Sequence, residues 1–154
     1  MQIACPAFSG PTQTMFVFDR DVPTLRSSMT FSPRSLLISA GLLGFTGVAL
    51  GAFGAHSLKA TLEPTGQLEN WKTAVFYQLV HAVALLALAN WPNPAAKRIG
   101  ACWVVGIMLF SGSLYCLALG DPIKLLWPVT PLGGLALLTG WLWLIWAAFR
   151  QTDA

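Results

Sequence analysis

A histidine and two other polar side chains lie within the apolar run Ala74–Trp91 of this chain. His81 follows Tyr77 by four residues and Gln78 by three, so the three side chains share one face of a helix. An ionisable group in such a run is costly unless it finds partners inside the protein. We therefore expect His81 to be neutral and hydrogen-bonded. Its role is open between a structural group, a proton relay or ligand contact, and a ligand for metal or haem.

A second polar group lies in the apolar run Ile99–Leu119. If the two runs pack together, their polar side chains either line a cavity or pair with one another in dry packing. The predicted polar cavity has six residues: Tyr77, Gln78, His81, Ser111, Ser113 and Tyr115.

Acidic residues are missing from the apolar runs, since Glu63, Glu69 and Asp121 all fall between them. Proton- and sodium-coupled carriers commonly use an acidic side chain within the membrane. The absence of such a residue from the apolar runs argues against a coupled carrier. The sequence also has no phosphate-binding loop, nucleophile elbow or zinc-protease motif. We expect no catalytic residues and no cofactor.

The spacing of the cysteines and of the second histidine along the predicted helices argues against a metal site. Cys102 and Cys116 are about 21 Å apart along one helix, and Cys5 is left alone, so no disulfide or Cys-x-x-Cys motif is expected. In an antiparallel hairpin, His56 lies about 10 Å shallower than His81. We expect no metal, and we expect His56 to contact headgroups or its own helix end.

The elements that must position these residues are four apolar runs of nearly bilayer length. Charged residues make up 10% of the chain and hydrophobic ones 55%, whereas ordinary soluble domains carry about 25% charge. The net charge of +3 is spread out, which argues against a nucleic-acid partner. Because the loops between the later runs are short, we predict an all-α integral membrane four-helix bundle, up-down-up-down. The expected spans are Leu36–Ala55, Ala74–Trp91, Ile99–Leu119 and Val129–Phe149.

Two domains are expected: a flexible N-terminal tail at 1–34 and a four-span domain at 35–150, with Met29 as an alternative start. Helix starts are predicted at three polar-proline pairs. The segment between the first two spans is broken by Pro64 and should hold a short interfacial turn, with the next helix able to begin at Thr65. The three pairs are Ser32-Pro33, Asn93-Pro94 and Thr130-Pro131.

Lysine and arginine bias predicts that both termini are cytoplasmic. Six of these residues flank the expected cytoplasmic ends, and three flank the others. Four tryptophans are expected near the membrane interfaces: Trp71, Trp91, Trp127 and Trp146.

Small residues form a stripe on the first span, because their spacing alternates between three and four. Such a stripe lets helices approach closely, either inside the bundle or in a homodimer. The predicted helix-packing residues are Gly44, Gly47, Gly51 and Gly54.

Several segments together resemble the small inner-membrane proteins grouped as domain of unknown function 423. The resemblance spans about residues 29–149 and implies a multi-span bacterial membrane protein without an assigned activity. It marks His56, Gly133 and Gly134 as motif residues whose role it does not specify. The segments that carry it are Gly51–His56, Trp71–Gln78, His81–Leu86, Leu109–Tyr115 and Thr130–Gly134.

Two functions remain open from the sequence. The first is a structural or accessory membrane component, and the second is a carrier or channel for a small solute with a polar cavity around His81. The expected location is the bacterial plasma (inner) membrane. The expected partners are the lipid bilayer and either a second copy of the chain or a larger membrane complex.

Overall fold

The computed structural model describes residues 34–120 and 128–151, and within these ranges the regular structure is helical throughout. Four helices are long and apolar enough to cross a membrane. A short helix, α2, lies between the first two. The bounds are α1 Arg34–Ala55, α2 Lys59–Leu62, α3 Leu68–Leu88, α4 Ala96–Ala118 and α5 Val129–Phe149. The expected tail, Met29 and the Ser32-Pro33 pair lie outside the described residues.

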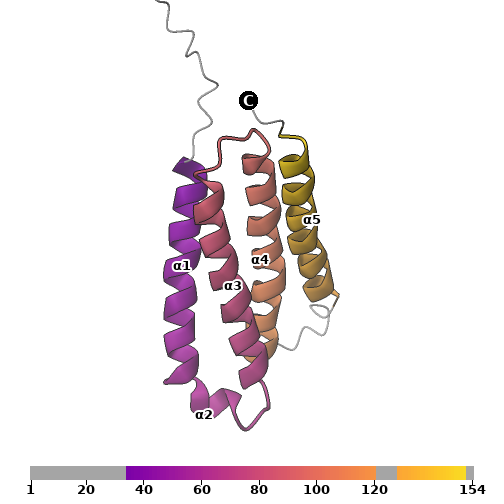
Figure 1. Cartoon of the computed structure of the whole chain (residues 1–154). Coiled ribbons are helices and arrows are strands. Elements are labelled where there is room, and N and C mark those ends of the chain that lie inside the picture. Colours follow the sequence, from indigo (N-terminus) through magenta and orange to yellow (C-terminus); the bar gives the residue numbers. More distant parts are fainter. Residues whose placement is uncertain (1–33, 121–127, 152–154) are drawn as a thin grey trace, which may run out of the picture. The chain divides into compact units, whose positions relative to one another are not determined.

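The long helices run up and down and lie side by side in the order α1, α3, α4, α5 (Figure 1). Each helix packs mainly on its neighbours in this row, and α1 touches α4 only slightly. The all-α four-span bundle predicted from hydropathy is therefore confirmed. The inner helices α3 and α4 bury more of their residues than the outer helices α1 and α5.

The connection from α1 to α3 holds the short helix α2. Leu62 of α2 is fully buried against the bundle, whereas residues 59–61 are exposed. Gly66 has a φ of 68°, a left-handed conformation that glycine tolerates and that cannot continue a helix. For this reason α3 begins at Leu68, and not at Thr65.

Two predicted helix starts can be compared with the structure. The Asn93 side-chain oxygen accepts a hydrogen bond from the Ala95 N–H at 2.9 Å, just before α4. Helix α5 begins at Val129, so Thr130 and Pro131 lie inside its first turn and Thr130 does not cap it. The Thr130 hydroxyl is instead used between helices, as described below.

The core lies between α3, α4 and α5, with α1 joining at its start. Trp103, Leu85 and Ile99 are almost completely buried there. Large apolar side chains also point outward, and Phe45 is 75% exposed. Outward apolar side chains are what a bundle surrounded by lipid requires, because the bilayer replaces water as the solvent.

Candidate functional site

The six residues expected to form one polar cavity are divided among three places in the bundle. Gln78, Ser111 and Tyr115 face the space between α1, α3 and α4. His81 faces α5, and Ser113 meets the start of α5. Tyr77 is 39% exposed, and its ring packs against Phe110 with centroids 4.7 Å apart. The polar residues therefore do not line one path through the membrane.

Gln78 joins three helices by hydrogen bonds. Its amide nitrogen donates to the Leu43 carbonyl at 2.9 Å and to the Thr46 hydroxyl at 2.8 Å, both on α1. Its amide oxygen accepts from the Tyr115 hydroxyl of α4 at 3.0 Å. Thr46 in turn donates to the Leu42 carbonyl at 2.8 Å. Within the membrane such bonds hold helices together, because the backbone and side-chain groups have no water to bond.

A small cavity adjoins this network. Its volume is about 200 Å³, and its polar wall is formed by Thr46, Gln78, Ser111 and Tyr115. Ser111 is 1% exposed, and its hydroxyl has no hydrogen-bond partner among the described residues. A buried hydroxyl without a partner is costly. Spare lone pairs on Gln78 and Tyr115 remain beside the cavity, whereas the Ser111 hydroxyl itself has almost no surface accessible to water.

His81 is buried, and both of its ring nitrogens are engaged. The indole N–H of Trp141 on α5 lies 3.1 Å from His81 Nε2, and the Tyr77 carbonyl lies 2.8 Å from His81 Nδ1. An indole N–H can only donate, so Nε2 must accept and the proton must sit on Nδ1, where it donates to the carbonyl. This arrangement assigns His81 to a single neutral tautomer.

Aromatic rings enclose the imidazole. The Trp103 and Trp141 rings approach it edge-on with centroids 5.9 Å and 6.0 Å away, and their own centroids are 4.7 Å apart. The Tyr77 ring lies nearly parallel to it at 6.2 Å. The surroundings of His81 are therefore apolar apart from its two hydrogen-bond partners.

The third polar contact joins α4 to α5. The Ser113 hydroxyl donates to the Phe110 carbonyl at 2.9 Å and also lies 2.7 Å from the Thr130 hydroxyl. Since Ser113 has one proton, Thr130 supplies the donor for the second bond. Gly133 lies one turn further along α5, where an added Cβ would be 2.8 Å from the Leu109 carbonyl carbon. At Gly134 an added Cβ would meet only the Phe110 ring, at 3.8 Å.

The glycines of α1 lie at different distances from α3. An added Cβ would be 2.8 Å from Leu79 at Gly47 and 3.3 Å from Val75 at Gly51, but would meet nothing within 4 Å at Gly44. At Gly54 it would clash with the ring of Trp71. Close approach of α1 and α3 therefore depends on Gly47, Gly51 and Gly54, and Gly44 makes no such contact within the described residues.

Trp71 and His56 take no part in the polar networks described above. Trp71 is 3% exposed, and its N–H donates to the Leu50 carbonyl at 2.9 Å. Because Gly54 has no side chain, the ring of Trp71 can pack against it, and the ring is therefore buried. His56 is exposed in the turn after α1, whereas His81 is buried within α3.

The sequence reading missed the partners of these polar groups. Trp141 lies well inside its span, where a tryptophan N–H needs an acceptor, and this position was the available signal. Trp103 contributes a ring contact to His81 only, because its own N–H has no partner among the described residues. Thr46 and Thr130 also belong to the networks. Threonine can bond its own helix carbonyl as easily as another helix, so sequence does not reveal its cross-helix bonds.

Comparison with known proteins points to a single group of membrane proteins. The family model described as "Protein of unknown function (DUF423)" matches residues 50–134. The "UPF0382 membrane protein" of Haemophilus influenzae is 41% identical over 119 residues, covering 75% of this chain and 94% of the relative. The "UPF0382 inner membrane protein YgdD" of Escherichia coli K12 is 42% identical over 127 residues, covering 76% and 91%.

A fungal relative extends this comparison. The "UPF0382 membrane protein C1782.12c" of Schizosaccharomyces pombe is 38% identical over 107 residues, covering 66% of this chain and 91% of the relative. No solved structure matches the chain significantly.

Proposed function

The chain belongs to the DUF423 family of multi-span membrane proteins, and on that premise we propose that it is a structural or accessory component. It acts by packing with copies of itself or with a larger membrane complex. The bacterial inner membrane is its proposed location, since relatives from Escherichia coli carry that description.

The observation that carries this proposal is the pairing of polar side chains across helices. His81 is bonded by Trp141, Ser113 by Thr130, and Gln78 by Tyr115. Groups that satisfy one another in dry packing stabilise a bundle and leave no continuous polar route. A rigid apolar body of this kind is suited to assembly.

Disulfide cross-linking in intact membranes tests self-association. Single cysteines at Phe45 on α1 and Leu142 on α5 would probe the outer helices, in a variant without the native cysteines. Phe45 is 75% exposed and Leu142 66% exposed. We expect a cross-linked dimer, or a partner that co-purifies in a fixed ratio, at one of these faces. Val83, 68% exposed on the inner helix α3, is the matched control.

The proposal would be contradicted if two results were obtained in the same study. One is the absence of a cross-link at either outer helix. The other is a monomer without any co-purifying chain when the protein is extracted in mild detergent and weighed by native mass spectrometry.

The proposed orientation has both termini in the cytoplasm. Its support is the excess of Lys and Arg at one end among the described residues: Arg34, Lys97, Arg98 and Arg150 lie there, against Lys59 and Lys72 at the other end. Reporter fusions after Ala154 and between Glu63 and Glu69 test it. An externally active reporter at Ala154 would reverse the assignment.

The cavity beside Ser111 favours a second candidate function, the passage or binding of a small uncharged solute. The supporting observation is a space of about 200 Å³ whose polar wall is formed by Thr46, Gln78, Ser111 and Tyr115. No carboxylate lines this space, so its polar wall suits a neutral molecule that both donates and accepts hydrogen bonds.

Stopped-flow swelling of proteoliposomes with small polyols tests the second candidate. Ser111→Leu would fill the cavity and should abolish any flux above that of empty liposomes, whereas Gly134→Ala, outside the cavity, should retain it. If the wild type is no more permeable than empty liposomes, the solute reading fails and the structural proposal is unaffected.

A further inference from the structure

A recess with three cations lies between the start of α4 and the end of α5. Lys97 and Arg98 contribute from α4, and Arg150 follows α5 directly. The recess has a volume of about 700 Å³. Its lining contains no carboxylate among the residues that the structure describes.

The floor of this recess is apolar and aromatic. Trp143, Trp146 and Ala147 of α5 form it, and the Arg150 guanidinium lies 4.3 Å above the centre of the Trp146 ring. A cation over an indole ring is held by the ring quadrupole. Arg150 is thus oriented at the mouth of the recess.

Charge and apolar surface are separated by depth. Trp143 lies seven residues before Arg150 on the same helix, which is about 10 Å along the axis. The mouth therefore carries positive charge at the level of the headgroups, and the floor extends toward the hydrocarbon. A molecule that fits both parts has an anionic head and an apolar chain.

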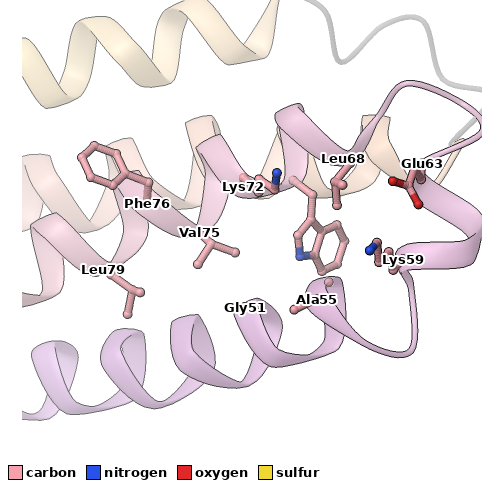
Figure 2. A pocket seen from close by; sticks show the side chains of 11 residues that line it. Gly51, Ala55, Lys59, Glu63, Leu68, Lys72, Val75, Phe76 and Leu79 are labelled. Carbon is pink, nitrogen blue, oxygen red and sulfur yellow. The ribbon is translucent and has the colours of Figure 1, made fainter.

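The groove at the opposite end of the bundle differs in its charges. It lies between α1 and α3, has a volume of about 570 Å³, and carries Lys59, Lys72 and Glu63 at its mouth (Figure 2). Lys72 is paired with Glu69 at 2.7 Å. With Glu63 in the lining and Glu69 paired with Lys72, two carboxylates balance the two lysines at this end, so we expect no preference for an anion. This groove supplies the matched control.

We propose that the recess between α4 and α5 binds an anionic phospholipid from the adjacent leaflet. Its phosphate contacts Lys97, Arg98 and Arg150, and one acyl chain lies along Trp143 and Ala147. Basic pockets between membrane helices recognise lipid phosphates in this way. Each cation near the surface strengthens binding about fivefold, so three cations give a preference of about a hundredfold over a zwitterionic lipid.

Native mass spectrometry of the full chain, titrated with lipid, tests the proposal. The probes are phosphatidylglycerol and phosphatidylcholine with the same acyl chains, with inorganic phosphate as a competitor. We expect the wild type to prefer phosphatidylglycerol by about a hundredfold. The variant Lys97→Gln/Arg98→Gln/Arg150→Gln should lose that preference, and Lys97→Arg should keep it.

The control variant Lys59→Gln/Lys72→Gln removes two charges at the other end and should retain the preference. Melting temperatures without lipid show that each variant is folded. Equal affinity for the two lipids would overturn the proposal, as would an equal loss in the control variant. Displacement of phosphatidylglycerol by millimolar phosphate would also overturn it, because the site would then recognise a free anion.

Discussion

The contact between α4 and α5 at Gly133 makes the sharpest stability prediction. A Cβ added there would lie 2.8 Å from both the Leu109 carbonyl carbon and the Phe110 Cα, and nearer still to the Phe110 nitrogen. Ordinary carbon contacts are about 3.5–4.0 Å. All three atoms belong to the backbone, so no side-chain rotation relieves the clash, and α5 must move away from α4.

The size of the effect follows from three contributions to the free energy of unfolding. Overpacking a core costs about 1–3 kcal/mol. Moving α5 also weakens the hydrogen bond between Ser113 and Thr130, and such bonds average about 0.6 kcal/mol in membranes. Alanine returns up to about 1 kcal/mol through its higher helix propensity. Gly133→Ala should therefore lower stability by about 0.6–2.6 kcal/mol when the full propensity gain is subtracted.

Gly134→Ala is the control, one residue away on the same helix. Its Cβ would meet the Phe110 ring at 3.8 Å, an ordinary contact, so only the propensity gain remains. Thermal unfolding in detergent, followed by tryptophan fluorescence, should place Gly133→Ala roughly 5 °C or more below Gly134→Ala. If the two variants melt together, α4 and α5 do not approach as closely as the structure indicates.

The remaining predictions concern α1 and His81. Gly47→Leu and Gly51→Leu should each lower stability by about one to several kcal/mol, because an added Cβ would already lie 2.8 Å and 3.3 Å from α3, whereas Gly44→Leu should be tolerated. Equal melting temperatures for the three variants would refute this. His81→Leu should cost about 1–3 kcal/mol by leaving the Trp141 N–H without an acceptor, and His81→Gln should cost less. Trp141→Phe combined with His81→Leu should cost less than the sum of the single changes, and strict additivity in a double-mutant cycle would show that the two side chains do not interact.

Hydropathy was sufficient to predict the architecture, because the bilayer imposes length and apolar composition on each span independently of its neighbours. The four long helices and their order up and down follow from this. Three of the small residues spaced by three and four, Gly47, Gly51 and Gly54, lie on the face of α1 that meets α3, whereas Gly44 does not. These features depend on local patterns or on short connections, so they can be read along the chain.

The division of the polar residues was decided only by the tertiary structure. Tyr77, Gln78 and His81 share one face by spacing, yet Gln78 bonds α1 and α4 while His81 bonds α5. A rotation of α3 by a fraction of a turn would take both side chains away from these partners, and helical periodicity does not determine that rotation. It is set by close packing such as that of Trp71 on Gly54 of α1. The position of α5 is set separately by Gly133, which brings α5 onto the backbone of α4. The sequence by itself determined that four apolar helices cross the membrane, whereas the pairing of their polar groups required the close packing of all four.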